Sequence, residues 1–356
     1  MNIPLQRTVR CLLAVALFAA CSAVAASPAA VPAPAPAPPP EQPTPSVMKA
    51  VRMHEYGDAS RLTFEDAPVP RPAKGQILLR VRAAGVNPVD WKIRSGAFKG
   101  GLDFPLPVIL GFDVAGEVER VGEGVSRFKK GDRVFAFLAL SRAGGYAQFA
   151  VVDQAEAARM PDELDFARAA ATPLAALTAW QCLFDKARLE KGQTVLVHAG
   201  AGGVGHFAVQ LAKWKGAKVI ATASSANSDF LKKLGADQVV DYKAVRFEDV
   251  VKDVDVVLDT VGEDTTNRSA AVLRKGGILV SIVGDPDPAV FAARGARAVD
   301  HLVEPNGAQL ARIADLLRTR ELVPHISLQL PLSDAAKAHT QSESGRTRGK
   351  IVLTVD

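Results

Sequence analysis

The sequence predicts an α/β protein in which a doubly wound parallel sheet is joined to a distorted β-barrel. Two patterns along the 356 residues support this prediction. Between residue 48 and about residue 161, short apolar runs are separated by glycine and proline, which is typical of the strands of a barrel. From residue 194 onward, apolar runs alternate with helical stretches, which indicates a parallel sheet covered by helices on both faces.

The composition excludes several classes of protein. With 48% hydrophobic and 23% charged residues, the chain is neither disordered as a whole nor collagen-like nor a coiled coil. The net charge is +5, but basic and acidic residues are interspersed, so we expect no nucleic-acid partner. Of the three cysteines, Cys11 and Cys21 precede the predicted fold. Cys182 alone can form neither an internal disulfide nor a multi-cysteine zinc site.

Residues 1–26 have the pattern of a secretory signal peptide. Arg7 and Arg10 precede an apolar run at residues 11–20, and small residues that offer an A-x-A cleavage site follow it. The apolar run is too short to cross a bilayer of ~30 Å, which needs ~20 residues. Because Cys21 ends a segment similar to a bacterial lipoprotein box, lipid modification of Cys21 stays open beside plain cleavage after Ala25 or Ala26.

Residues 27–47 are rich in proline and are predicted to be an extended linker. Such a spacer suits a chain that a lipid on Cys21 tethers to a membrane. We therefore expect an exported protein, periplasmic or lipid-anchored. The alternative is a cytoplasmic protein, if translation starts at Met48.

The body of the chain is predicted to contain three parts. Residues 48–170 form the β-rich domain, residues 171–300 form the parallel-sheet domain, and residues 301–356 return to the first domain. The strands expected in the first part include residues 76–83, 114–121 and 132–137. Those expected in the second are residues 194–198, 218–222, 238–241, 255–258 and 278–283. An interrupted helix is expected at 166–183, further helices at 206–214 and 308–319, and a last strand at 350–355.

A glycine-rich loop carries the strongest chemical signal. Gly200, Gly202 and Gly205 match G-x-G-x-x-G between a predicted strand and the helix at 206–214. The first glycine allows the tight turn, the second lets the backbone approach a diphosphate, and the third lets helix and strand pack closely. Since the N-terminus of a helix presents free N–H groups, the loop predicts a dinucleotide site.

The end of the following strand indicates which dinucleotide is bound. NAD sites place an acidic residue there to accept a hydrogen bond from the ribose 2′-hydroxyl group. This chain has Ser224 and Ser225 instead, with Lys232, Lys233 and Tyr242 nearby in the sequence. Serine hydroxyls can donate to a 2′-phosphate, so the pattern favours NADP(H). The alternative is that the serines only cap the next helix.

Five motifs make the chain from Met48 to Asp356 resemble the medium-chain dehydrogenase/reductase superfamily. Within it, the chain resembles the zinc-independent quinone oxidoreductase and enone reductase branch. The motifs are residues 85–92 (GVNPVDWK), 111–116 (GFDVAG), 173–180 (PLAALTAW), 202–205 (GGVG) and 345–350 (GRTRGK). The resemblance implies a GroES-like catalytic domain, a Rossmann cofactor domain and a homodimer.

The same resemblance argues against zinc. Zinc-dependent relatives carry a cysteine ligand where this chain has Asn87, and a histidine where it has Phe112. A phenylalanine has no atom that can bind zinc, and one remaining cysteine cannot complete a site. We therefore predict no metal ion.

Without zinc, side chains must stabilise the charge that develops on a substrate carbonyl oxygen. Lys92 is the first candidate, because a cation near a developing enolate lowers the barrier and because the resemblance places this lysine in the cleft. Asn87 is the second, as an amide donor to the carbonyl or to the nicotinamide ribose. Asp90 would orient Lys92 or the loop. The alternative is structural, with Asn87 in a turn and Lys92 as a solvated charge.

The resemblance also implies contacts to the cofactor. Thr178 and Val283 would contact the nicotinamide part, and Tyr242 would contact the 2′-phosphate. Arg348, late in the chain, would also contact the cofactor. The predicted NADPH-binding residues are Thr178, Gly200, Gly202, Gly203, Val204, Gly205, Ser224, Ser225, Tyr242, Val283 and Arg348.

Two functions are consistent with this sequence. The first is an NADPH-dependent, zinc-independent oxidoreductase that transfers hydride to quinones or α,β-unsaturated carbonyl compounds. The alternative is a non-catalytic NADPH-binding protein, similar to a crystallin or a sensor, tethered outside the cytoplasm. A leader favours the alternative, because free NADPH is not expected outside the cytoplasm.

Overall fold

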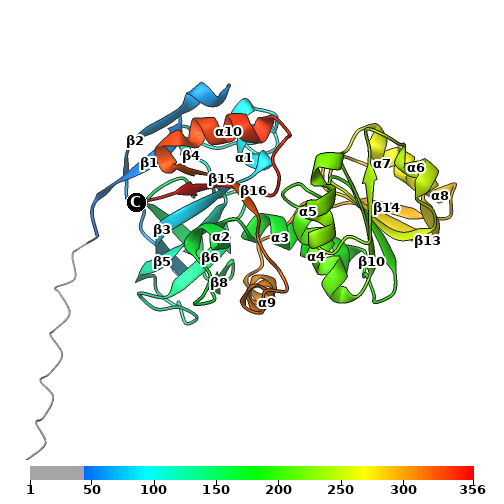
Figure 1. Cartoon of the computed structure of the whole chain (residues 1–356). Coiled ribbons are helices and arrows are strands. Elements are labelled where there is room, and N and C mark those ends of the chain that lie inside the picture. Colours follow the sequence, from blue (N-terminus) through cyan, green and yellow to red (C-terminus); the bar gives the residue numbers. More distant parts are fainter. Residues whose placement is uncertain (1–43) are drawn as a thin grey trace, which may run out of the picture. The chain divides into compact units, whose positions relative to one another are not determined.

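The computed structural model describes residues 44–356 (Figure 1). The predicted signal peptide, the lipid site at Cys21 and most of the predicted linker lie outside the described residues. Within residues 44–356 the chain forms three sheets. No helix in this part of the chain combines the length and the hydrophobicity that crossing a bilayer requires.

Two of the sheets form the β-rich part. The larger has seven strands in the order β15-β16-β3-β5-β6-β8, with β7 also paired to β3, and the smaller has the order β2-β1-β4. The strands are β1 (Val47–Met53), β2 (Leu62–Pro68), β3 (Gln76–Val86), β4 (Val108–Ile109), β5 (Asp113–Val121), β6 (Arg133–Phe137), β7 (Phe149–Asp153), β8 (Ala157–Arg159), β15 (Ile326–Pro331) and β16 (Lys350–Thr354).

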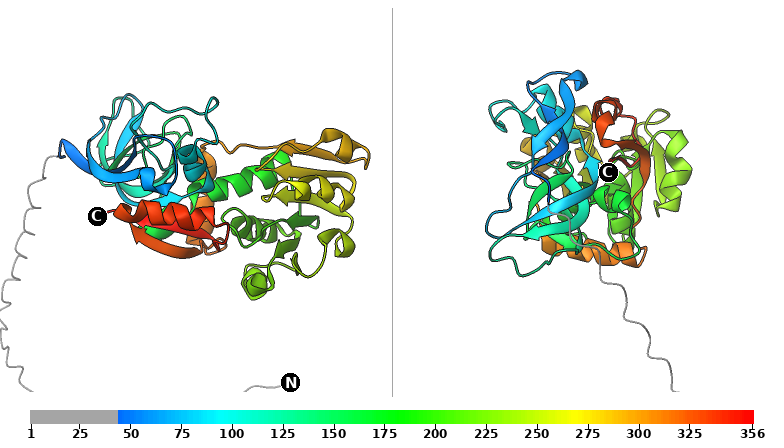
Figure 2. Two further views of the ribbon diagram at one scale, coloured as in Figure 1. Left: turned by 90° about the horizontal axis from the view of Figure 1, so that it is seen from above. Right: turned by 90° about the vertical axis from the view of Figure 1, so that its left-hand side faces the viewer.

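The end of the chain lies in the same sheet as its beginning. Strand β16 pairs antiparallel with β3 and parallel with β15. Helix α10 (Ala335–Glu343) lies beside α1 (Pro88–Ser95), and the views in Figures 1 and 2 show the red C-terminal elements next to the blue and cyan strands. This arrangement brings residues from both ends of the described chain to the start of α1.

The third sheet is parallel, with the order β11-β10-β9-β12-β13-β14. Its strands are β9 (Thr194–Val197), β10 (Lys218–Ala223), β11 (Gln238–Asp241), β12 (Val254–Asp259), β13 (Leu273–Ser281) and β14 (Arg297–Asp300). Strand β9 has β10 on one side and β12 on the other, so the strand order reverses there. In such sheets ligands bind outside the carboxyl ends of the strands at this reversal.

Helices cover both faces of the parallel sheet (Figure 1). Val195 and Val197 of β9 belong to the apolar cluster that includes α4 (Gly205–Lys215) and α5 (Ser228–Lys233). Leu196 between them belongs to a second cluster with side chains of α6 (Phe247–Val250) and α8 (Pro288–Ala292). Because both faces are buried, the predicted doubly wound fold is confirmed.

The remaining elements connect these layers. The predicted interrupted helix is α2 (Phe166–Ala170) followed by α3 (Pro173–Trp180), because proline starts a helix well but cannot continue one. The others are the π-helix η2 (Gln181–Lys186), α7 (Asp264–Arg268), α9 (Gly307–Arg318), and the 3₁₀ turns η1 (Ala59–Arg61), η3 (Ser225–Asn227), η4 (Ser269–Ala271) and η5 (Leu332–Asp334). The limits predicted for the three parts of the body stay a prediction.

Candidate active site

The glycine loop joins the carboxyl end of β9 to the start of α4. A Cβ atom on Gly205 would lie 2.3 Å from the carbonyl oxygen of Ala199, and one on Gly200 would lie 2.8 Å from the Cβ atom of Ala221. Gly200 is therefore needed for the loop to pack against β10, and Gly205 is needed for α4 to start close to the loop. Gly202 and Gly203 are only partly buried, so the backbone before α4 remains accessible. The loop fits the diphosphate of a dinucleotide, which prefers the N–H groups at such a helix start.

Arg348 reaches the loop after β10, where Ser224 and Ser225 lie. Its Nε atom donates to the side-chain oxygen of Asn227 at 2.7 Å, and its Nη2 atom donates to the carbonyl oxygen of Ala226 at 3.0 Å. Ser225 is exposed, and the Ser224 side chain accepts no capping hydrogen bond from a backbone N–H of the following turn. The structure therefore brings a cation and two hydroxyl groups to the place where a 2′-phosphate is expected.

Asn87 precedes α1 and is almost completely buried. Its Nδ2 atom donates to Oδ2 of Asp113 at 2.8 Å, and its Oδ1 atom accepts a hydrogen bond from Nζ of Lys350. The other oxygen of Asp113 accepts from the backbone N–H of Leu174, at the start of α3, at 2.7 Å. Two strands and two helices therefore hold this amide.

Lys350 and Asp113 form a buried pair of opposite charges. Their Nζ and Oδ2 atoms lie 3.7 Å apart, and the two side chains are 2% and 0% exposed. Burial raises the pKa of Asp113 and lowers the pKa of Lys350, and each charge opposes the shift of the other. For both groups, the effect of losing contact with solvent on the pKa is larger than the effect of the opposite charge, which is common for buried ion pairs.

Asp90 holds the loop before α1. Its Oδ2 atom accepts from the backbone N–H of Asn87 and from the Tyr146 hydroxyl, each at 2.7 Å. Nε2 of His339 lies 3.2 Å from that hydroxyl. Burial raises the pKa of Asp90 to about 7 and lowers the pKa of His339 to about 3. These bonds fix the loop, and the predicted role of Asp90 in orienting Lys92 or the loop stays a prediction.

Four further predicted site residues lie at three places. Lys92, on α1, is partly exposed, with its Nζ atom 5.8 Å from the centre of the Trp91 ring. Thr178 is buried in α3, and its hydroxyl donates to the carbonyl oxygen of Leu174 at 2.7 Å. Tyr242 follows β11 and Val283 follows β13, and the two residues are 60% and 39% exposed. The last two lie at the carboxyl end of the parallel sheet.

Two polar residues of this centre had no predicted role. Asp113 and Lys350 lie in motifs that the sequence analysis quoted, GFDVAG and GRTRGK, yet no chemistry was assigned to them. The available signal was a lysine at the start of an apolar run, residues 350–355, because a lysine in a buried strand needs an acidic partner.

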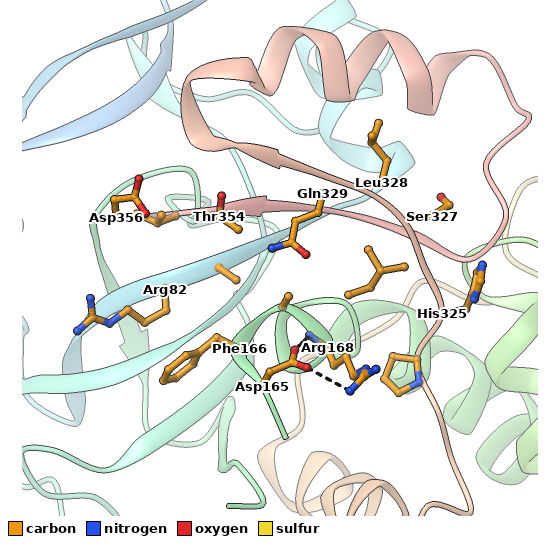
Figure 3. Close-up of a pocket in the computed structure, with 15 residues that line it drawn as sticks. Arg82, Asp165, Phe166, Arg168, His325, Ser327, Leu328, Gln329, Thr354 and Asp356 are labelled. Carbon is orange, nitrogen blue, oxygen red and sulfur yellow. Dashed lines mark hydrogen bonds and ion pairs between the residues drawn. The ribbon is translucent and has the colours of Figure 1, made fainter. Parts of the chain in front are cut away.

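A cavity of about 690 Å³ lies between α2 and strands β3, β15 and β16 (Figure 3). Arg82, Asp165, Arg168 and Gln329 are among its polar residues, and the dashed lines show that Arg168 is paired with Asp165. A second cavity of about 430 Å³ is lined mainly by apolar side chains that include Phe104 and Ile109. None of the predicted site residues lines either cavity, so we do not assign the reaction to them.

The prediction that the protein uses no metal ion stays a prediction. Phe112 is fully buried in the position where the resemblance places a histidine ligand in zinc enzymes. Among residues 44–356, no three histidine, cysteine, aspartate or glutamate side chains are grouped so that they could hold a metal ion.

Comparison with known families matches both parts of the described chain. Residues 73–162 match the alcohol dehydrogenase GroES-like domain, and residues 234–353 match the family described as zinc-binding dehydrogenase. The first match agrees with the predicted GroES-like fold of the β-rich part.

Individual relatives point to the same superfamily. The chain is 37% identical over 320 residues to a 2-methylene-furan-3-one reductase of Solanum lycopersicum. This alignment covers 87% of this chain and 79% of the relative. It is 34% identical over 320 residues to a chloroplastic NADPH-dependent alkenal/one oxidoreductase of Arabidopsis thaliana, with 87% and 80% covered. The solved quinone oxidoreductase of Coxiella burnetii matches with a TM-score of 0.82 and 36% identity, over 87% of this chain and all of that one. The chain therefore belongs to the medium-chain dehydrogenase/reductase superfamily of oxidoreductases, in the part that includes quinone and enone reductases.

Proposed function

We propose that the protein uses NADPH, without a metal ion, to reduce quinones or α,β-unsaturated carbonyl compounds. One observation carries this proposal: the glycine loop and the Asn87 centre are joined through two consecutive residues. The backbone N–H of Gly349 donates to the carbonyl oxygen of Ala201 at 2.8 Å, and Lys350 donates to the side chain of Asn87. The names of the relatives support the acceptor class, since they describe enone and quinone reductases.

The residues of the chain divide the work of holding the cofactor. In this proposal the glycine loop holds the diphosphate, while Ser224, Ser225, Tyr242 and Arg348 hold the 2′-phosphate. Thr178 and the backbone at Val283 contact the nicotinamide part. When bound, NADPH supplies a hydride.

The remaining residues stabilise the acceptor. An enone that accepts a hydride at its β-carbon develops negative charge on its carbonyl oxygen, and preorganised donors at that oxygen lower the barrier. We assign this task to the ammonium of Lys92 and to an N–H of the Asn87 amide. Asp90 keeps the Asn87 loop in place through the bonds described above.

Purified protein should oxidise NADPH when either menadione or 3-penten-2-one is added. The expected result is saturable loss of the NADPH absorbance at 340 nm, measured in each case against protein without acceptor. A protein that binds NADPH and reduces neither compound would be the non-catalytic NADPH-binding protein of the alternative interpretation.

Removing the groups after β10 should weaken NADPH binding and spare NADH. Each charge-assisted hydrogen bond to phosphate contributes roughly 1.5–3 kcal/mol. Arg348→Ala, and Ser224→Ala combined with Ser225→Ala, should therefore each raise the dissociation constant for NADPH at least about tenfold. Fluorescence titration measures both cofactors, with Arg318→Ala on α9 as the control. Equal losses for NADPH and NADH would contradict the assignment of these groups to the 2′-phosphate.

Export, a lipid on Cys21 and a homodimer also stay proposals. The first two rest on the leader sequence and the third rests on the resemblance. The mass of the mature N-terminus distinguishes a lipid-modified Cys21, an end at Ala26 or Ser27, and a start at Met48. Light scattering would distinguish a dimer from a monomer.

A further inference from the structure

Lys350 is a buried cation whose ammonium group contacts the strand end before α1, Asn87 and Asp113. Its Nζ atom donates to the carbonyl oxygen of Val86 at 3.1 Å and to Oδ1 of Asn87, and it lies 3.7 Å from Asp113. Its side chain is only 2% exposed. Burying an ammonium costs free energy unless it is paired and hydrogen-bonded. A lysine at this position therefore calls for a role of its positive charge, because an apolar side chain of similar length would avoid this cost.

The contacts of Lys350 determine which way the Asn87 amide points. An ammonium only donates hydrogen bonds, so the amide oxygen must face Lys350. A carboxylate only accepts them, so the amide nitrogen must face Asp113, 2.8 Å away. The opposite orientation would place two donors together on one side and two acceptors on the other. One N–H of Asn87 is thereby used by Asp113, and within residues 44–356 the second makes no hydrogen bond.

The stem of Lys350 lies against the glycine loop. A Cβ atom on Gly203 would lie 3.6 Å from Cδ of Lys350 and 3.6 Å from the carbonyl oxygen of Gly349. Gly349 has φ +64, and a Cβ atom there would lie 2.2 Å from the carbonyl oxygen of His325, so this position next to Lys350 requires glycine. Lys350 therefore contacts the cofactor loop with its methylene groups and Asn87 with its charge.

We propose that Lys350 is a positioning residue that holds Asn87 as a hydrogen-bond donor for the substrate carbonyl. This inference rests on the proposed function. Donation from the ammonium to the amide oxygen makes the amide N–H a stronger donor, because linked hydrogen bonds polarise one another. The positive charge of Lys350 also favours the negative charge that develops on the carbonyl oxygen, because only the Asn87 amide separates the two groups in this proposal. Asp113 balances the ammonium when no substrate is present.

A double-mutant cycle tests whether Lys350 acts through Asn87. Lys350→Met keeps most of the stem against the glycine loop and removes the charge. It should lower kcat for 3-penten-2-one roughly 30- to 100-fold, and change the KM for NADPH less than about threefold. Asn87→Ala should lower kcat by a similar factor. The double variant should be no more than about twofold slower than Asn87→Ala alone, because residues that act as one unit are not additive.

Three further variants separate positioning from folding. Lys350→Arg keeps a donor and should recover part of kcat. If Lys350→Met does not fold, Lys350→Met combined with Asp113→Asn removes both buried charges and should show the same loss of kcat. Lys337→Met, an exposed lysine on α10, should leave kcat unchanged. Two results would overturn the inference. One is a double variant whose loss of kcat equals the product of the two single losses, and the other is an unchanged kcat in folded Lys350→Met.

A second measurement does not depend on turnover. In protein labelled with ¹⁵N-asparagine, the side-chain amide protons of Asn87 should exchange slowly in the original chain and at least about tenfold faster in Lys350→Met. Equal exchange in both proteins would contradict the positioning role. If the original protein reduces neither menadione nor 3-penten-2-one, the proposed function fails, and this exchange measurement still decides the part that concerns Lys350.

Discussion

Gly205→Ala is expected to weaken NADPH binding at least about tenfold and to lower the free energy of unfolding by roughly 1–3 kcal/mol. The added Cβ atom would lie 2.3 Å from the carbonyl oxygen of Ala199 and 2.8 Å from Cα of Gly200. Both neighbours are backbone atoms, which cannot turn away as a flexible side chain can. The loop or the start of α4 must move, and either movement displaces the N–H groups that would hold the diphosphate.

The two effects are measured by fluorescence titration with NADPH and by urea denaturation. Gly101→Ala is the matched control, since its Cβ atom would meet only the carbonyl oxygen of Phe98, at 3.7 Å. This control should change neither quantity. If Gly205→Ala bound NADPH as tightly as the original protein, the cofactor would not be held at this loop.

Lys92→Met is expected to lower kcat/KM for an enone at least about 100-fold and to leave NADPH affinity nearly unchanged. Removing one donor to a developing oxyanion typically raises the barrier by ~2.7–4 kcal/mol, which corresponds to this factor. Methionine keeps the length of the stem and removes only the charge. Steady-state kinetics with 3-penten-2-one and a separate titration with NADPH measure the two quantities.

Lys99→Met is the control for Lys92. Its Nζ atom lies 5.0 Å from the centre of the Tyr56 ring, so this lysine has the same kind of aromatic contact as Lys92. Its replacement should change kcat/KM less than about twofold, as is usual for exposed positions. Equal turnover by Lys92→Met and the original protein would remove Lys92 from the chemistry and leave Asn87 as the donor.

The strands of the parallel sheet could be predicted because both faces of that sheet are buried. Buried strands consist of continuous apolar runs, and β9 to β12 lie within one or two residues of the predicted bounds. Strand β13 was predicted to begin at residue 278, but it begins at Leu273 and ends at Ser281. Its residues 274–276 are exposed and polar or glycine, so the apolar run marks only the buried end of the strand.

Two elements near the C-terminus were missed for related reasons. Within the described residues, strand β15 pairs with β16 alone, and its residues alternate between half-buried and exposed. Helix α10 has few large apolar residues. Its buried residues include Ala338 and His339. Neither segment has a strong periodic pattern, so contacts with β16 and α1, rather than local preference, explain why they are ordered.

The pairing at the centre of the site could not be predicted from local pattern. Lys350 and Asn87 are 263 residues apart in the chain, and the bond between them exists only because β16 lies beside β3. The motif that contains Asn87 indicated a polar site, and the apolar run after Lys350 indicated a buried strand. Their contact depends on strand order, which neither segment specifies alone.

The central claim is that side chains alone direct hydride from NADPH to an electron-poor acceptor. The most direct test uses protein freed of metal by dialysis against a chelator, 3-penten-2-one, and NADPH that carries deuterium at the transferred position of C4. We predict that the product carries one deuterium atom on its β-carbon, detected by NMR, at the rate shown before dialysis. Loss of the reaction after dialysis and its return with zinc, or a product without deuterium, would contradict the account.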